Sequence, residues 1–244
     1  MPSSRSRPAE LGRLGAVPFA HRGLHGGALV ENSAAAIAAA VAQGWGVELD
    51  VQLSRDGEAM VFHDYELDRL TAERGPVAER TAAQLQAIRL SACNEAIASL
   101  SEVLRIVGGR APLLVEVKSR DRRVAGLCGA VAKALPGYEG PVGVMSFNPQ
   151  VGGWFARNAP DVLRGLVVTE GGQRGMRGRI ERPLALWRAR ADFLAYDIRD
   201  LPSRFAAAAR ARGIPVYTWT VRSESDGARA AEHADQIIFE APPA

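Results

Sequence analysis

Short apolar runs alternate with helix-like stretches along most of the chain. Eight runs have the length and β-branched content of strands, at residues 16–20, 47–53, 112–117, 142–146, 163–168, 192–197, 214–220 and 236–239. Between the first two, Asn32 or Ser33 can cap a helix in which Ile37 and Val41 share one face. A helix is likewise predicted over 202–212. This alternation and count predict an α/β fold, a TIM-type (β/α)₈ barrel.

One strand-like run does not fit the alternation. Residues 59–63 follow the second strand directly, and the connection contains Asp56-Gly57, a strong hairpin signal between two β-type runs. We therefore expect residues 59–63 to pair antiparallel with the second strand, as a small hairpin insertion. Helical patterns at 81–88 and 99–107 then precede the strand at 112.

The domain organisation follows from the absence of any linker-like composition. Residues 16–244 are predicted to form a single barrel domain, and the polar residues 1–15 a flexible N-terminal segment. The Gly- and Arg-rich stretch 170–179 is predicted to be a solvated connecting loop.

Composition narrows the class of protein and its partners. With 47% hydrophobic and 23% charged residues, the 244-residue chain is typical of a globular protein. Its net charge of +3 comes from scattered arginines, so we expect no nucleic-acid partner. No apolar run reaches the roughly 18 residues of a membrane span, so no stable membrane insertion is expected. Without a signal-peptide pattern, and with Cys93 and Cys128 expected as reduced, packed thiols, a cytoplasmic location is predicted.

The ionisable residues of two strands are placed to converge. Side chains two apart in a strand point the same way, so Glu48 and Asp50 share a side of the second strand. Glu116 and Lys118 share a side at the end of the third, where barrels of this type carry their chemistry. Like charges at about 4 Å cost on the order of 4 kcal/mol at an effective dielectric near 20. Three carboxylates therefore indicate a hard divalent cation, Mg²⁺ or Ca²⁺.

Two histidines and an arginine lie at other strand ends. His21 and His63 have the near-neutral pKa that suits a general base and a general acid, and Arg22 offers a planar fork for phosphate oxygens. If the histidines share one proton, the metal-loaded site is net positive and would attract a monoanionic phosphodiester.

These residues occur in motifs that resemble the glycerophosphodiester phosphodiesterase family. The motifs are AHRG at 20–23, ENS at 31–33, VELDV at 47–51, RDGEAMVFHDYELDRLT at 55–71, SLSEVL at 99–104, LLVEVK at 113–118, SFNP at 146–149 and VYTWTV at 216–221. The resemblance spans nearly the whole chain. It implies a TIM-barrel hydrolase that cleaves a glycerophosphodiester, a small-molecule substrate, to sn-glycerol 3-phosphate and an alcohol.

The resemblance also implies individual roles. His21 matches the family's general base and His63 its general acid, while Arg22 and Lys118 match phosphate contacts. The metal ligands are expected to be Glu48, Asp50 and Glu116. Attack on phosphorus by a glycerol hydroxyl, through a cyclic phosphate, and attack by water both remain open.

A few positions admit two interpretations or depart from the family pattern. Glu31 and Asn32 can brace a loop or contact substrate, and Trp219 can wall the glycerol side of the pocket or pack in the core. The family's last strand usually reads like DGIITD, whereas here it ends in Phe239-Glu240, which can reshape the rim of the pocket. His25 and His233 are expected at loop or surface positions.

Three other functions compete with this interpretation. A phospholipase D-like or lysophospholipid-cleaving enzyme on the same scaffold would need an apolar path for acyl chains. A glycoside hydrolase using Glu48 and Asp50 would leave His21, Arg22 and His63 unexplained. A non-catalytic phosphate-ligand binder would keep the pocket without turnover. The sequence does not indicate the oligomeric state.

Overall fold

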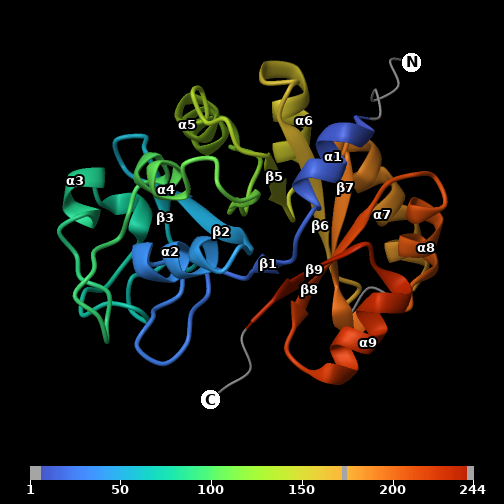
Figure 1. The fold of residues 1–244 in the computed structure, drawn as a ribbon. Coiled ribbons are helices and arrows are strands. Elements are labelled where there is room, and N and C mark those ends of the chain that lie inside the picture. Colours follow the sequence, from blue (N-terminus) through green and yellow to red (C-terminus); the bar gives the residue numbers. More distant parts are fainter. Residues whose placement is uncertain (1–6, 172–174, 241–244) are drawn as a thin grey trace.

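Eight parallel strands close into a barrel in the computed structural model, which describes residues 7–171 and 175–240 (Figure 1). The ring contains β1 (Phe19–Ala20), β2 (Gly46–Leu53), β4 (Leu113–Val117), β5 (Val142–Ser146), β6 (Leu163–Val168), β7 (Phe193–Asp197), β8 (Val216–Val221) and β9 (Gln236–Phe239). It closes because β1 pairs in parallel with both β2 and β9. The predicted TIM-type barrel, with all eight of its strands, is confirmed.

The predicted hairpin insertion is present outside the ring. Strand β3 (Ala59–Val61) pairs antiparallel with β2, with Val51 opposite Val61, and Gly57 supplies a φ of +89° in the turn between them. The insertion has its own apolar centre, in which Met60, Phe62 and Leu67 are buried. It delivers the segment that begins at His63 to one end of the barrel.

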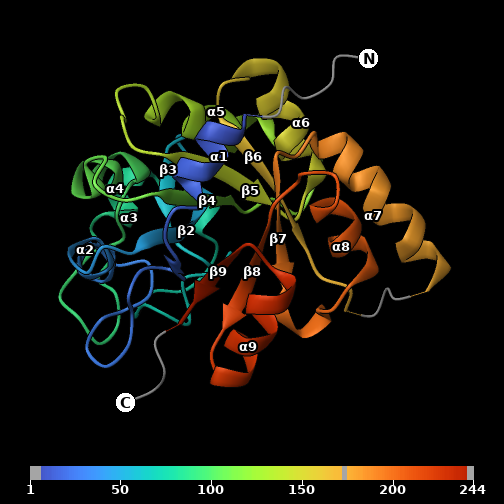
Figure 2. The same cartoon turned by 45° about the vertical axis from the view of Figure 1, so that its right-hand side comes forward.

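Helices surround the ring on its outer side (Figure 2). They are α2 (Ala34–Ala42), α4 (Leu100–Val107), α5 (Ala125–Ala134), α6 (Pro149–Asn158), α7 (Met176–Ala189), α8 (Arg204–Arg210) and α9 (Glu224–His233), with short turns η1 (Val77–Glu79), α3 (Ala82–Leu85) and η2 (Ile198–Asp200). Local sequence sets several helix starts: Ser33 caps α2, and Ser99 forms a capping box with Glu102 at α4. The helices predicted near 32–44, 81–88, 99–107 and 202–212 are present, although α3 has only four residues.

The alternation of side chains along the strands separates the core from the site. Val47, Leu49 and Val51 of β2 point outward and pack in the largest apolar cluster, between strands and helices. Glu48 and Asp50 point into the barrel instead. Below them, aromatic rings fill the interior, with Phe193 stacked on Tyr217 at a centroid distance of 5.0 Å.

The N-terminal segment differs from the prediction. Residues 8–14 were expected to be flexible, but they form α1 (Pro8–Leu14), with Pro8 at the start of the helix. Leu11 and Leu14 lie three apart on one helical face and pack against the barrel interior, where Leu14 is fully buried. Residues 1–6 lie outside the described residues.

The predicted loop at 170–179 is also wrong in part. Met176 begins helix α7, and Arg177 forms an i,i+4 ion pair of 2.6 Å with Glu181. Ala185 and Leu186 of its inner face pack against the second apolar cluster. Packing therefore overrides the local Gly and Arg content. Residues 172–174 lie outside the described residues.

Two further expectations concern thiols and membranes. Cys93 and Cys128 are free thiols that pack against apolar clusters, as predicted, and burial raises the pKa of Cys128 to about 12. In the described part of the chain, no helix has the length and apolar character needed to span a bilayer.

Candidate active site

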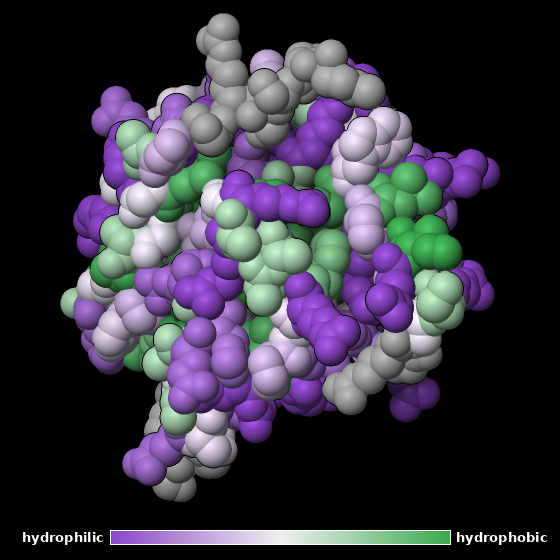
Figure 3. Space-filling view, turned by 90° about the vertical axis from the view of Figure 1, so that its right-hand side faces the viewer, coloured by the Kyte–Doolittle hydropathy of each residue, from purple (hydrophilic) through white to green (hydrophobic). Residues whose placement is uncertain are grey.

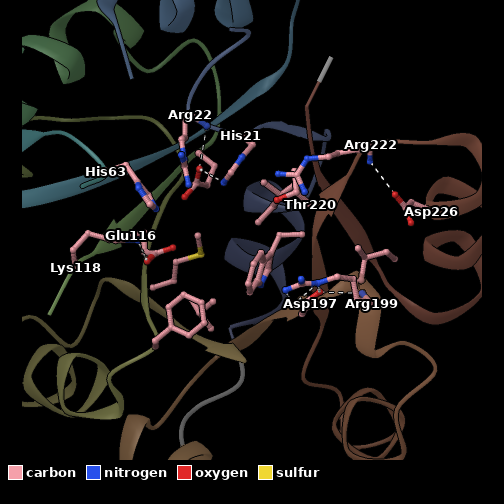
Figure 4. Close-up of a pocket in the computed structure, with 17 residues that line it drawn as sticks. His21, Arg22, His63, Glu116, Lys118, Asp197, Arg199, Thr220, Arg222 and Asp226 are labelled. Carbon is pink, nitrogen blue, oxygen red and sulfur yellow. Dashed lines mark hydrogen bonds and ion pairs between the residues drawn. The ribbon is translucent and has the colours of Figure 1, made fainter. Parts of the chain in front are cut away.

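The carboxyl ends of the barrel strands surround a pocket of about 410 Å³. His21, Arg22 and His63 line one side of it, and Arg199 and Arg222 lie on the other (Figure 4). Glu48, Glu116, Lys118 and Trp219 also line the pocket, and Asp50 is buried against Lys118 and Arg22. All eight residues predicted for the site thus come together at one end of the barrel.

Three buried carboxylates form the floor of the site. The parallel register places Asp50 of β2 directly opposite Glu116 of β4, and Glu48 precedes Asp50 by two residues on the same side. Carboxylate oxygens of the three residues lie within 4.8 Å of one another. Lys118 Nζ lies 2.8 Å from Glu116 Oε1 and 3.3 Å from Asp50 Oδ1, so it offsets only part of the negative charge.

Burial and mutual repulsion make this cluster costly to ionise. Burial, and then the charges of Asp50 and Glu116, raise the pKa of Glu48 well above its usual value. Burial and the charge of Asp50 raise the pKa of Glu116 to about 6. At Asp50 burial acts in the same direction, but Lys118 and Arg22 outweigh it and lower the pKa. The neighbouring cationic side chains do not balance the charge of three buried carboxylates, so the group suits a hard divalent cation.

His21 leaves β1 with both ring nitrogens directed at carboxylates. Its Nδ1 lies 2.7 Å from Glu240 Oε1, and its Nε2 lies 3.9 Å from Glu48 Oε2. Arg222 holds Glu240 from the other side, through Nε–Oε2 and Nη2–Oε1 hydrogen bonds of 2.6 and 2.8 Å. Burial lowers the pKa of His21, although the hydrogen bond to Glu240 opposes the shift.

A tight turn after His21 explains the Arg22-Gly23 pair. Both residues have positive φ, 55° and 78°, and a Cβ at Gly23 would lie 2.7 Å from the backbone of Ala36. Only glycine fits there. The turn directs the Arg22 backbone N–H to Glu48 Oε2 at 3.1 Å and places its Nε 3.2 Å from Asp50 Oδ2.

His63 is held by a chain of charged residues behind it. Its Nδ1 lies 2.5 Å from Asp64 Oδ1, and Asp64 accepts a hydrogen bond from Arg69. Arg69 also binds Glu31 through two hydrogen bonds, and Glu31 accepts a 2.8 Å bond from Arg22. Burial lowers the pKa of His63.

Bracing contacts are present for both residues of the ENS motif that had two interpretations. Glu31 ties Arg22 to Arg69, as described above. Asn32, buried and at φ 59°, donates to Asp50 Oδ2 at 3.1 Å and accepts from the Asp50 backbone N–H. Both residues therefore brace the site.

Trp219 is anchored in the barrel interior and also lines the pocket. Its indole N–H donates to the carbonyl of Ala195 at 3.0 Å, which fixes the ring inside the barrel mouth. The ring lines the pocket and meets Phe147 edge-on at a centroid distance of 5.6 Å. Phe147 is one of several pocket residues that the sequence pattern did not single out, with Arg199, Arg222 and Asp226.

His25 lies closer to the site than we expected. It is in a loop, as predicted, but it is half-buried, and one of its ring nitrogens lies within 4.8 Å of ligand atoms of His21 and Glu240. Because His21 Nδ1 already binds Glu240, we favour the all-carboxylate group as the ion site.

Comparison with known proteins identifies the family of this chain. The model of the glycerophosphoryl diester phosphodiesterase family matches residues 21–239. The chain belongs to this family. The family resemblance and the enzyme type predicted from the motifs, a glycerophosphodiester phosphodiesterase, are thereby confirmed.

Several known proteins are similar to this chain over nearly its full length. A glycerophosphodiester phosphodiesterase of Caldanaerobacter subterraneus is 28% identical over 239 residues, which span 92% of this chain and 93% of that protein. A phosphodiesterase structure from Oleispira antarctica, in complex with the product sn-glycerol-3-phosphate, has a TM-score of 0.79 at 24% identity, covering 91% of each chain. A glycerophosphodiester phosphodiesterase from Thermotoga maritima gives a TM-score of 0.72 at 22% identity, covering 91% of this chain and 94% of that one. These structural likenesses show the same barrel fold.

Proposed function

We propose that this chain hydrolyses glycerophosphodiesters to sn-glycerol 3-phosphate and an alcohol, in a cation-dependent reaction with His21 and His63 as proton carriers. One observation carries the proposal: two histidines, Arg22 and Lys118 line one pocket together with Glu48 and Glu116, which form a buried carboxylate group with Asp50. The product bound to the Oleispira enzyme supports the choice of substrate class.

Glu48, Asp50 and Glu116 would hold the divalent cation, Mg²⁺ or Ca²⁺. When bound, such an ion supplies positive charge to the phosphate oxygens as a Lewis acid. The carboxylates suit this task because their oxygens already lie within 4.8 Å of one another and are shielded from solvent.

Arg22 and Lys118 would bind the phosphodiester. Both are held at the edge of the carboxylate group by ion pairs, with Arg22 Nη1 on Glu31 and Lys118 Nζ on Glu116. Their side chains are therefore positioned before substrate arrives, which reduces the entropy lost on binding.

His21 and His63 would each carry a proton in the reaction. In the tautomer in which His21 Nδ1–H donates a hydrogen bond to Glu240, Nε2 keeps its lone pair toward the pocket, as a general base requires. Asp64 binds His63 Nδ1 and stabilises the protonated ring, as a general acid requires. Trp219 would form the wall against the glycerol moiety.

We propose that the chain forms a single barrel domain, which includes α1 because Leu11 and Leu14 pack against the barrel interior. The two free thiols are consistent with a reducing compartment, so we propose a cytoplasmic location.

The activity is tested by measuring glycerol 3-phosphate released from glycerophosphocholine and glycerophosphoethanolamine, with Mg²⁺, Ca²⁺ or EDTA. We expect turnover with at least one cation, none in EDTA, and losses of about 10²- to 10⁴-fold in His21→Ala and His63→Ala. His233→Ala, which alters a histidine of α9 outside the pocket, is the matched control and should keep full activity.

The competing functions give different results in the same assay. Turnover of lysophosphatidylcholine alone would indicate the lysophospholipid-cleaving enzyme. Cleavage of glycosides that survives EDTA would indicate a glycoside hydrolase. Binding of glycerophosphodiesters with no turnover would indicate a binding protein.

A further inference from the structure

Helix α7 carries a row of large apolar side chains on its solvent side. Of the five large hydrophobic residues that are exposed in the described part of the chain, four are in this helix. Met176, Ile180, Leu184 and Trp187 are 71, 65, 40 and 69% exposed. At 3.6 residues per turn they fall within about 80° of one another around the helix. We call these four residues the α7 stripe.

The α7 stripe is additional to the apolar face that binds α7 to the barrel. Ala185, Leu186 and Ala189, on the inner side, pack against the second apolar cluster. An ordinary surface helix is polar on its outer side, so a second apolar face points to a partner. On the side of the molecule that α7 covers, apolar side chains are exposed among hydrophilic ones (Figure 3).

Arginines border the α7 stripe. Arg177 and Arg188 follow the stripe on one side of the helix and Arg179 lies on the other, and Arg190 ends the helix. All four are exposed. Glu181 is the single acidic residue between 176 and 190, and it already pairs with Arg177. The outer face of α7 is therefore apolar at its centre and positive at its edges.

We propose that α7 docks this protein on the surface of an anionic lipid bilayer. An interfacial helix buries an apolar stripe that includes Trp, Leu or Phe at the level of the head groups, and its flanking cations attract anionic lipids. The α7 stripe and its arginines have this arrangement. Helix α7 lies on the outer side of the strand ring (Figure 2), and none of its residues lines the pocket at the strand ends. The inference does not depend on the proposed reaction.

A second copy of the chain fits this face less well. In a two-fold symmetric contact along α7, the same patch meets itself, so Arg177 and Arg188 of one copy would face the arginines of the other. Only Glu181 is available to offset them, and it is already paired. Charge complementarity thus favours an anionic lipid surface over self-association.

The test is flotation of the full-length protein with lipid vesicles. We expect binding to vesicles of phosphatidylcholine with about 30% phosphatidylglycerol, and little binding to phosphatidylcholine alone, since each arginine near such a surface contributes roughly fivefold. Arg177→Ser/Arg188→Ser should weaken binding about 25-fold. The matched control, Arg55→Ser/Arg74→Ser, removes two exposed arginines that lie outside α7, in the β2–β3 turn and before η1, and should bind like the unmodified protein.

The apolar part of the α7 stripe is tested separately. Ile180→Glu/Trp187→Glu should abolish flotation yet leave the far-ultraviolet circular dichroism and the turnover of a water-soluble substrate unchanged, because both side chains are exposed. Anionic vesicles should shift tryptophan emission to the blue in the unmodified protein. Trp187→Phe should still float but lose that shift.

Three outcomes would overturn the proposal. One is equal binding to vesicles with and without phosphatidylglycerol. Another is binding that survives Ile180→Glu/Trp187→Glu. The third is a dimer in sedimentation velocity that this double variant converts to a monomer, which would show that a second copy covers the α7 stripe.

Discussion

Glu240 stands where the family pattern usually has the shorter aspartate. The glutamate side chain is one methylene group longer, and its Oε1 lies 2.7 Å from His21 Nδ1. Arg222 donates hydrogen bonds to both of its carboxylate oxygens. Hydrogen bonds to His21 and Arg222 keep the pKa of Glu240 far below its usual range, even though burial opposes the shift. Glu240 is therefore a charged, fixed partner for His21.

We predict that Glu240→Gln lowers kcat and leaves KM almost unchanged. The amide oxygen can still accept the Nδ1 proton, but it no longer stabilises a positive charge on the ring, which a base gains as it takes up a proton. Carboxylates that orient a metal-ligating histidine are typically worth about 10- to 100-fold, and we expect a loss of similar size here. Glu224→Gln, an exposed carboxylate of α9, is the control. An unchanged kcat in Glu240→Gln would show that the contact is only structural.

Among single residues, strand periodicity predicted which carboxylates converge, but it did not predict the residues that support them. Glu48, Asp50 and Glu116 converge as expected because side chains two apart in a strand must share a side. The supporting residues were not predictable in this way. Glu240 meets His21 across 219 residues, at the seam where the last strand joins the first, and no local pattern marks such a contact.

Among the elements, α1 shows why local composition misleads. Residues 1–15 contain three arginines and three serines, and helix α1 has only two large apolar residues, Leu11 and Leu14, which is too few for a clear periodic signal. The helix forms because Leu14 fits a space at the barrel floor: a Cβ added at Gly143 of β5 would lie 2.9 Å from its side chain. Tertiary packing decides the outcome.

We predict that Leu14→Ala destabilises the protein by about 2–5 kcal/mol, because it empties a fully buried position beneath the barrel. Gly12→Ala in the same helix is the matched variant. Gly12 is exposed, and no atom lies near a Cβ added there. Gly12→Ala should therefore raise the free energy of unfolding by about 0.5–1 kcal/mol. Urea unfolding measures both. A flexible segment, as first expected from composition, would make both substitutions nearly neutral.

At the scale of the whole molecule, the apolar clusters between strands and helices stabilise the barrel, whereas the buried carboxylates of Glu48, Asp50 and Glu116 repel one another at its mouth. The apolar packing between strands and helices could be predicted from the alternation of the sequence, because each strand buries one face against helices. The protonation of the carboxylate group could not, since it depends on burial and on distances between strands. Burial and these distances determine how the free energy of unfolding responds to pH and to metal.

The carboxylate group should make the metal-free protein less stable as pH rises. Glu116 has a folded pKa of about 6 against 4.5, so the folded state holds its proton more tightly. The associated stability is present below pH 4.5 and is lost as pH rises through about 6, a change on the order of 2 kcal/mol. The raised pKa of Glu48 acts in the same direction.

Glu48→Gln separates this effect from the rest of the protein. Its amide keeps an oxygen for the Arg22 N–H but removes one charge from the group. In EDTA, we predict that Glu48→Gln unfolds at a higher temperature than the unmodified protein at about pH 8 and at nearly the same temperature at about pH 4.5. Mg²⁺ or Ca²⁺ at about 100 times its Kd should stabilise the unmodified protein by about 2.7 kcal/mol and the variant far less. Glu79→Gln, an exposed carboxylate, should change neither response. If the ion stabilised Glu48→Gln and the unmodified protein equally, the cation would have to bind elsewhere, because removal of a ligand must lower the affinity of a site for its ion.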